Sequence, residues 1–380
     1  MTYRPAVVRD VLCRVIPLLV LAFVLLALFS GEARAQWQIS SEGGKSSIRI
    51  GVLLQPQGEW VGIGQSTKDT SQNVFVRRAR IVIGATINEK LSFFLETDNP
   101  NLGKQVVSTN ADLKQEDMFI QDVIVTWASG TAFQIDMGKM LLPLSHNHQQ
   151  GAGTLLPVDY GTYTFNATAH TDSHVGRDYG FQARGYPLNK HLEYRLGVFQ
   201  GVRGSNATNP LRTIARVVWY PFEAETGFFY TGTNFGTKKI LALGGSYDTQ
   251  GVYKTYALDA YWDWPVANGD GVTAQVDYMH LQPDRAFHTA ALDKQKTWLL
   301  EGGYYFHITK LEPFAQYSLT DFVNTDLADK DQLLLGIAWW GNGHKFNVKF
   351  SAGRQHVDNA PSLAGSNHAV VVVQAQIFPW

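Results

Sequence analysis

After Gln36 the chain repeatedly alternates apolar and polar residues, and no helical periodicity of any length interrupts the alternation. Clusters of Gly, Asn, Asp, Pro and Ser separate segments of about ten residues, the length of a membrane-crossing strand. A period of two is typical of β-strands, because successive side chains point to opposite faces. Sixteen candidate strands follow: Ile48–Trp60, Asn73–Ile87, Lys90–Asp98, Met118–Ala128, Ala132–Met140, Gly176–Tyr186, His191–Gly201, Leu211–Phe222, Lys239–Asp248, Tyr253–Trp264, Gly271–Leu281, Thr297–Phe306, Leu311–Phe322, Gln332–Trp340, His344–Gln355 and His368–Phe378.

The two faces of these segments differ in a way that predicts a transmembrane barrel. In His344–Gln355 one face carries Phe346, Val348 and Phe350, and the other carries Lys345 and Lys349. A dry sandwich core would not hydrate two lysines, whereas a wet lumen would. Only 17% of the residues are charged, which is low for a soluble protein, yet the mean hydropathy is too polar for a helical membrane bundle. An all-β, antiparallel barrel with an apolar outside and a polar inside satisfies both facts.

The lengths of the connections alternate as well. Short turns at Asn88-Glu89 and Ser129-Gly130 alternate with long links such as Asn99–Asp117 and Leu141–Val175. Outer-membrane barrels have short turns on one rim and long loops on the other. Glu223–Lys238 is the exception, because a long link falls where a short turn is due; it is either an excursion of that rim or a misread pairing. Sixteen strands fit this pattern, and fourteen or eighteen fit nearly as well.

Aromatic residues gather at the strand ends, as in the two girdles that mark the membrane interfaces of a barrel. The alternative is ordinary packing at turns. The residues concerned are Trp60, Trp127, Trp219, Tyr220, Trp262, Trp264, Trp339, Trp340 and Trp380.

The first 35 residues have the pattern of an export signal. Arg4, Arg9 and Arg14 precede an apolar run over residues 16–29, and Ala33-Arg34-Ala35 fits a small-residue cleavage site. The alternative, a membrane anchor, needs roughly 20 apolar residues. We therefore expect a signal peptide over residues 1–35 and one barrel domain over residues 36–380. The mature chain would lack Cys13, the single cysteine, and hence any disulfide.

Several stretches resemble the phosphate-selective porin O/P family of Gram-negative outer-membrane channels. The match begins with an Arg-Arg-x-Arg strand and includes a Gly-Lys-Met-x-x-Pro turn into the third long loop. In chain order the stretches are Val74–Gly84, Met118–Trp127, Met137–Ser145, Arg177–Gly180, Tyr220–Phe222 and Lys238–Asp248. The last third of the chain agrees in pattern alone.

The resemblance implies a sixteen-stranded outer-membrane barrel, a homotrimer, whose third loop folds into the lumen and narrows it. Leu141–Val175 suits that loop by its length and polar composition. It supplies the residues expected at the constriction: His146, His148, Asp159, Tyr163, His170 and His174. A final aromatic residue is typical of such barrels as an assembly signal; this chain ends Phe378-Pro379-Trp380 and not in Phe, which is a departure from the family's pattern.

Eight basic residues are expected to line the pore and bind anions: Arg49, Arg78, Arg80, Arg184, Arg195, Arg216, Lys345 and Lys349. Fixed guanidinium groups replace part of an anion's hydration shell, which is how a pore selects anions. Arg78 and Arg80 lie two apart on one strand, so they point to the same side about 7 Å from each other. The strict alternation turns Arg77 the other way, toward a rim or a subunit contact.

The same alternation sends eleven carboxylates inward, so a second interpretation stays open. In it the charges form ion pairs that keep the wall polar without selecting anions. The acids are Glu96, Asp98, Asp122, Asp136, Asp178, Glu193, Asp259, Asp263, Asp277, Glu301 and Glu312. The family's lysine clusters lie in outer loops, whereas Lys238-Lys239, the one adjacent lysine pair here, falls on the opposite rim.

The loop histidines suggest two hypotheses. His146 and His148 have a spacing that could seat a metal, but no cysteine or closed ligand set accompanies them, so no metal or cofactor is expected. A constriction that gains positive charge as the medium acidifies is the more interesting hypothesis, because histidine titrates near neutral pH.

The sequence thus predicts an outer-membrane porin for passive diffusion of small solutes, with a preference for anions or phosphate as one interpretation of its basic residues and an ion-paired, unselective wall as the other. Its partners would be outer-membrane lipid, the permeating solutes and two further copies of the chain; the near-neutral net charge gives no indication of nucleic-acid binding. No Gly-x-Ser-x-Gly elbow is present, and we expect no enzymatic activity. The alternatives are a barrel with a structural or adhesive role and, less favoured, a secreted soluble β-rich binding protein.

Overall fold

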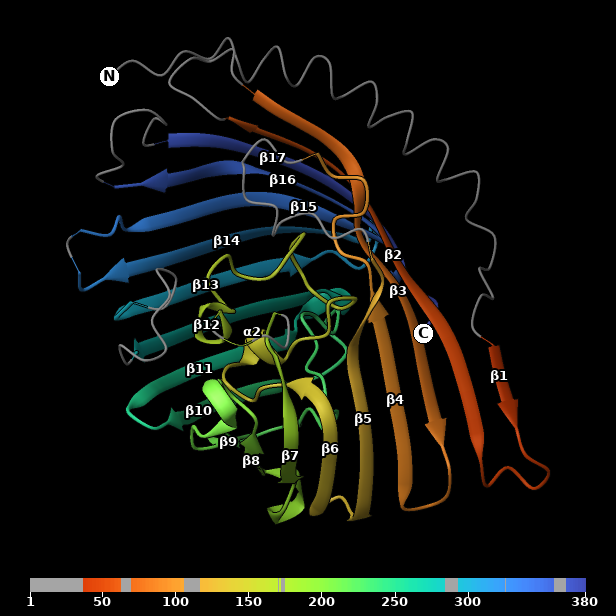
Figure 1. The fold of residues 1–380 in the computed structure, drawn as a ribbon. Coiled ribbons are helices and arrows are strands. Elements are labelled where there is room, and N and C mark those ends of the chain that lie inside the picture. The colour runs from red at the N-terminus through yellow and green to blue at the C-terminus, as the bar shows by residue number, and fades with distance from the viewer. Residues whose placement is uncertain are drawn as a thin grey trace.

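The computed structural model describes residues 37–62, 70–105, 117–169, 171, 175–283, 293–324, 326–358 and 367–380. Sixteen antiparallel strands, β2 to β17, follow one another around a closed ring in which β17 pairs with β2. Figure 1 shows this barrel from the side. Within the described residues, no helix is both long and apolar enough to cross a membrane. The expected all-β barrel with sixteen strands is confirmed.

The elements have the following bounds: β1 (Trp37–Ser40), β2 (Ser47–Gly62), β3 (Thr70–Thr86), β4 (Leu91–Asp98), β5 (Phe119–Gly130), β6 (Phe133–Leu141), α2 (His146–Gln149), η2 (Asn166–Thr168), β7 (Arg177–Gly185), η3 (Leu188–Lys190), β8 (Leu192–Phe199), η4 (Ser205–Ala207), β9 (Arg212–Trp219), β10 (Ile240–Gln250), β11 (Tyr253–Pro265), η5 (Ala267–Gly269), β12 (Gly271–Gln282), β13 (Gln295–Tyr305), β14 (Leu311–Phe322), β15 (Lys330–His344), β16 (Phe346–Val357) and β17 (Asn367–Ile377). Each predicted strand corresponds to one of β2–β17. The sequence did not predict β1, which pairs with the first residues of β2.

The two faces of the strands differ as expected. In β11 the outward side chains Tyr256 and Leu258 are exposed, and the inward Thr255 and Asp259 are buried. All eleven carboxylates predicted to point inward are buried. The loops described below contact the inner face with polar groups, and a barrel lumen tolerates polar residues, while apolar residues cover the outside.

The expected aromatic girdles are present in part. Trp127, Trp219 and Trp262 are exposed on the outer face. Tyr220 and Trp340, by contrast, are buried and donate hydrogen bonds inside the barrel to Glu193 and Glu312. The girdle interpretation was wrong for these two residues, because neighbouring aromatic residues at a strand end point to opposite faces.

The C-terminal residue also lies on the inner side. The Arg49 guanidinium carbon is 4.4 Å from the centroid of the Trp380 ring. A Cβ added to Gly51 or Gly84 would come within 2.9 Å of the Trp380 ring, so the absence of side chains at these two glycines makes room for the indole. Trp380 thus closes over the inner face of β2 and β3 instead of joining an outer girdle.

A β-bulge in β3 corrects the expectation for Arg77. Leu54 faces Ala79 and Pro56 faces Val76, so β3 contains one residue more than β2 at this point. An extra residue shifts the alternation by one position, which turns neighbouring side chains to the same face. Arg77 and Arg78 therefore both reach inward and bind the same carboxylate, Asp159.

The long link between β9 and β10 leaves the short-turn rim and returns to it, because these two strands are neighbours in the barrel. The two strands pair directly, with Trp219 opposite Leu243, so the predicted pairing was right. Residues 220–239, called the rim segment below, fold into the barrel, where Tyr230 and Thr233 are buried. On the long-loop rim, β10 and β11 are joined by a turn at Gly251-Val252, shorter than the pattern predicted; Gly251 adopts a φ of 61° that favours glycine.

Candidate functional site: the narrowed lumen

The link between β6 and β7 folds into the barrel, as predicted for the third long loop. We call residues 142–176 the constriction loop. Its short helix α2 begins after Ser145, whose hydroxyl accepts a hydrogen bond from the His148 backbone N–H. All four residues of α2 are fully buried, and Figure 1 shows the helix inside the ring of strands. The backbone N–H of Asn147 donates to Asp277 of β12 at 2.9 Å, which fixes the loop to the wall.

The loop is joined to the opposite wall by an arginine clamp. The Asp159 carboxylate accepts from Arg77 Nε at 2.7 Å and from Arg78 at 2.6 Å. Burial alone would raise the pKa of Asp159, but the two guanidinium groups hold it well below its ordinary value. The Arg78 guanidinium also lies 5.5 Å from the centroid of the Tyr160 ring. The clamp contains two positive charges and one negative charge.

A row of three arginines crosses the next part of the wall. Arg184 of β7, Arg195 of β8 and Arg216 of β9 occupy directly opposite positions on neighbouring strands. Like charges placed this way repel one another, so each needs a counter-charge. They find it in Asp136, Glu193 and Asp259, at N–O distances of 2.7, 2.5 and 2.6 Å.

Arg216 reaches its partner across a whole strand. Asp259 lies on β11, two strands away from β9, and Gly244 of β10 lies between them. A Cβ on Gly244 would approach the Arg216 guanidinium to 2.6 Å and the Asp259 carboxylate to 2.5 Å. The glycine therefore leaves the space in which this ion pair forms.

The other basic residues predicted to line the pore have different surroundings. Arg80 is buried and binds both Glu96 and Asp98. Lys349 is buried and donates to the backbone carbonyl oxygens of Leu155 and Pro157 in the constriction loop, at 2.5 and 3.0 Å. Lys345 is exposed in the turn between β15 and β16, and Arg49 is exposed beside Trp380.

A group of four carboxylates on the facing wall has no arginine or lysine within salt-bridge distance among the described residues: Asp263, Asp277, Glu301 and Glu312. Neutral donors bind them instead. Glu312 accepts from the Trp340 indole at 2.7 Å, and Glu301 from Gln316 at 3.0 Å. We call these four residues the carboxylate group.

The predicted constriction residues differ in character. His148 is buried against Phe165, and burial with nearby arginines lowers its pKa to about 3, so its ring is neutral. Tyr163 is buried, which raises its pKa to about 12. His170 and His174 lie outside the described residues. Among the described residues, no group of three or more His, Cys, Asp or Glu could hold a metal ion.

Two inward arginines escaped the sequence analysis. Arg212 lies four residues before Arg216 on β9, so both side chains point to the same face, and Arg212 binds Asp248. Applying the alternation of β9 from Arg216 back to its first residue would have predicted that Arg212 points inward. Arg177 has the outward parity of β7, yet it binds Asp122 at 3.0 Å and is buried. No local pattern predicts Arg177, because it lies at the end of β7 directly after Gly176, which has a φ of 81°.

The comparisons with known proteins agree with this geometry. The family model of phosphate-selective porin O and P matches residues 62–242, which overlaps all the stretches that carried the resemblance. No curated protein matches the chain. An anion-selective porin from Comamonas acidovorans is 13% identical, with 88% of this chain and 100% of that chain covered and a TM-score of 0.62.

Two further solved structures show the same fold. OmpF of Salmonella typhi is 14% identical, covers 89% of this chain and 100% of its own, and has a TM-score of 0.59. OmpT of Vibrio cholerae, in its trimer form, is 11% identical, covers 88% of this chain and 100% of its own, and has a TM-score of 0.55.

The closed barrel, its inward loop and the matched family model define the class of this protein, which is that of the outer-membrane porins. Within that class, the family it resembles is that of phosphate-selective porin O and P.

Proposed function

We propose that this porin conducts small solutes passively and that its arginine-rich wall is neutralised in place, so that it exerts little net attraction on anions. The observation that carries the proposal is that Arg80, Arg184, Arg195, Arg212 and Arg216 are all buried against carboxylates. An anion entering this wall competes with a fixed carboxylate that is already hydrogen-bonded. If the anion displaced that carboxylate, the carboxylate would remain as a buried charge without a partner, which costs about 3–5 kcal/mol.

The balance of charges supports the same proposal. The carboxylate group has no cationic partner among the described residues, whereas the clamp holds one positive charge in excess of Asp159. A permeating ion therefore meets a positive field at the clamp and a polar, hydrogen-bonded wall at the carboxylate group. Such a wall favours hydrated, small polar solutes of either sign over one class of anion.

A second candidate function, preference for anions such as phosphate, is favoured by the clamp alone. Arg77 and Arg78 bring two guanidinium groups to one point of the constriction, and guanidinium groups match the geometry of oxyanions. In this case the clamp would act as a weak anion site against an otherwise neutral wall.

Reversal potentials in a salt gradient separate the two candidates. Purified protein in planar bilayers should conduct, with a reversal potential near zero and weak competition by phosphate. Replacing Arg78 and Arg80 by Ala should lower the permeability of anions relative to cations, since Asp159, Glu96 and Asp98 lose counter-charges. A strongly anion-selective wild type that phosphate blocks at low concentration would contradict the proposal of a neutralised wall.

The same measurement tests the alternatives. A barrel with a structural or adhesive role, its lumen filled by the two inward segments, would pass little current. A secreted soluble protein would leave the membrane fraction without detergent. A conducting, detergent-dependent protein supports the porin proposal.

Export and assembly complete the proposal. We propose that residues 1–35 are removed on export, which leaves the barrel domain 36–380, and that three copies assemble in the outer membrane. The trimer form of OmpT, which shares the fold, supports the second point. The intact mass of the purified protein tests the cleavage, and chemical cross-linking in detergent tests the trimer.

A further inference from the structure

This inference rests on the proposed function. We infer that the rim segment is the second half of the constriction, and that its Glu225 is a positioning residue that holds His146 of the constriction loop in place. Glu225 lies between β9 and β10 on the short-turn rim, whereas the constriction loop enters from the opposite rim. The narrowest part of the pore would then be formed where two segments from opposite ends of the barrel meet.

The backbones of the two segments are joined like two strands. Gln150 and Tyr230 form a parallel bridge, in which Tyr230 N–H donates to Gln149 O at 2.9 Å and Gly151 N–H donates to Tyr230 O at 3.0 Å. A third bond runs from Gly232 N–H to Thr154 O at 3.1 Å. Bonds between backbones hold two segments at a fixed spacing whatever their side chains, so the segments move together.

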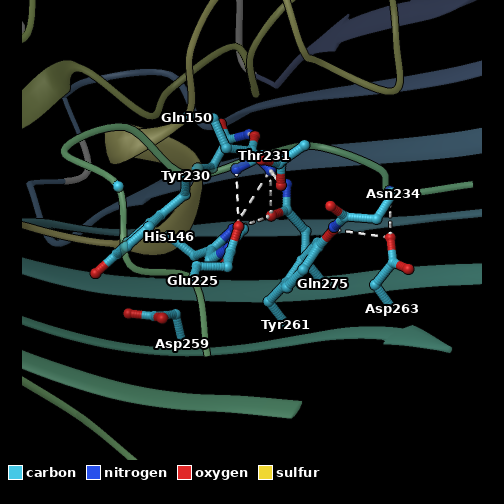
Figure 2. Close-up of polar contacts among 12 residues, drawn as sticks. His146, Gln150, Glu225, Tyr230, Thr231, Asn234, Asp259, Tyr261, Asp263 and Gln275 are labelled. Atoms are coloured by element: carbon cyan, nitrogen blue, oxygen red, sulfur yellow. Dashed lines mark hydrogen bonds and ion pairs between the residues drawn. The ribbon is translucent and has the colours of Figure 1, made fainter. Parts of the chain in front are cut away.

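The side chain of His146 is enclosed by the rim segment and the wall. Figure 2 shows its ring between those of Tyr230 and Tyr261. The centroid of the His146 ring lies 4.9 Å from that of Tyr230 and 4.0 Å from that of Tyr261, and both pairs of rings are stacked. Its Nε2 lies 2.8 Å from Glu225 Oε2, and its Nδ1 lies 3.0 Å from Gln275 Oε1. Both ring nitrogens thus lie at hydrogen-bond distance from an acceptor oxygen, which suits the doubly protonated, positively charged ring, and the Gln150 amide nitrogen lies farther from Nδ1, at 3.3 Å.

Glu225 is itself held in position. Its second oxygen, Oε1, accepts from the Thr231 backbone N–H at 2.8 Å, and the side chain is buried. The rim segment is also bound to the wall, because Asn234 N–H donates to Asp263 at 2.7 Å and Arg195 donates to Phe228 O at 2.9 Å. The carboxylate is therefore fixed before His146 meets it, which is what a positioning residue requires.

The charges around His146 decide how the contact depends on pH. The groups that face it are Glu225 and Tyr230 from the rim segment, Gln150 from its own loop, Asp259 and Tyr261 from β11, and Gln275 and Asp277 from β12. Burial alone would lower the pKa of His146, but Glu225 and, after it, Asp277 and Asp259 raise it above its ordinary value. Asp259 is already bound by Arg216, so Glu225 is the main partner.

The sign of the pH effect follows from that direction. A histidine whose pKa is raised on folding gives its ionic stabilisation in full below its ordinary pKa of about 6.5, and loses it as the pH rises through the raised value. The contact between the two segments is therefore strongest in acid and neutral medium and weakens in alkaline medium. When this contact weakens, α2 moves away from Glu225 while the backbone bonds at residues 149–154 still hold the two segments together, and the pore widens at α2.

Single-channel conductance of the Glu225→Gln variant tests the inference. The amide keeps the shape of the side chain but removes its charge. Glu223→Gln is the matched control, because Glu223 lies on the same segment, is exposed, and binds the backbone N–H of Lys239 away from His146. Conductance would be recorded for full-length mature protein in planar bilayers from about pH 5 to about pH 9, the range in which histidine titrates.

The wild type and Glu223→Gln should show a conductance that rises with pH. Glu225→Gln should already have the wild type's alkaline conductance at neutral pH, and its rise should move to lower pH; Glu225→Asp should restore part of the wild-type profile. If Glu225→Gln does not fold, His146→Gln removes the same contact from the other loop and is judged in the same way. Identical profiles for Glu225→Gln and Glu223→Gln would overturn the inference. A wild type that passes no current would overturn the proposed function instead.

Discussion

The arginine row and the carboxylate group lie in one lumen and come from the same alternation, yet they solve the problem of burying charge in opposite ways. Arg184, Arg195 and Arg216 each have an ionic partner. Glu301 and Glu312 are equally buried but bind amide and indole donors. The difference teaches that the identity of the inward residues determines how polar a pore is. The pairing among these residues determines how much of their charge a permeating ion meets.

Substitution in the arginine row should have the largest effect. Arg195→Ala would leave Glu193 as an unpaired charge in the wall, where its side chain is 0% exposed. Removing one partner of a buried ion pair costs about 3–5 kcal/mol. Urea unfolding in detergent, followed by tryptophan fluorescence, measures the loss.

Arg354→Ala is the control for this experiment. Arg354 lies 4.0 Å from Asp331 and its side chain is 58% exposed, so the change should stay within about 1 kcal/mol. Equal losses in the two variants would show that the arginine row is no more tightly coupled than a surface pair.

Asp159→Asn should have the largest effect on ion selectivity. It removes the shared counter-charge of Arg77 and Arg78, which leaves two guanidinium groups free to bind a permeating anion. The ratio of anion to cation permeability should rise, and inorganic phosphate should begin to compete with chloride. Reversal potentials measure both; Asp358→Asn, at an exposed site beside His356, is the control and should leave the ratio unchanged. A fall in the ratio for Asp159→Asn would contradict our account of the clamp.

Glu301→Gln should have the smallest effect. Glu301 accepts one hydrogen bond from Gln316 and has no ionic partner among the described residues, so the amide leaves no unpaired charge behind. The free energy of unfolding should change by less than about 1 kcal/mol, and the permeability to cations should fall slightly. A loss as large as that of Arg195→Ala would show that the carboxylate group is bound more strongly than its contacts indicate.

The strands and their faces could be predicted from the sequence because alternation is a local property. It gave β2–β17 and the inward position of residues such as Arg80 and Glu312. The four residues of β1 are too few to show a period. The bulge that turns Arg77 inward also lacks a sequence signal of its own, since it depends on the register between β2 and β3.

The contacts within the site were less predictable, because they join residues far apart in the chain. Arg216 meets Asp259 across the space left by Gly244, and His146 meets Glu225 from the opposite rim. Local patterns identify which residues are available for such pairs. The loop paths and the closure of the ring decide which pairs form.

The position of Trp380 has a practical consequence for anyone who modifies the chain ends. Its indole lies on the inner side of β2 and β3, beside Arg49 and above Gly51 and Gly84. A tag fused after Trp380 would begin inside the mouth of the barrel and would have to pass through it or pull the indole away. Trp37, the first residue of β1, is 72% exposed, so a segment inserted directly before it would leave this opening clear.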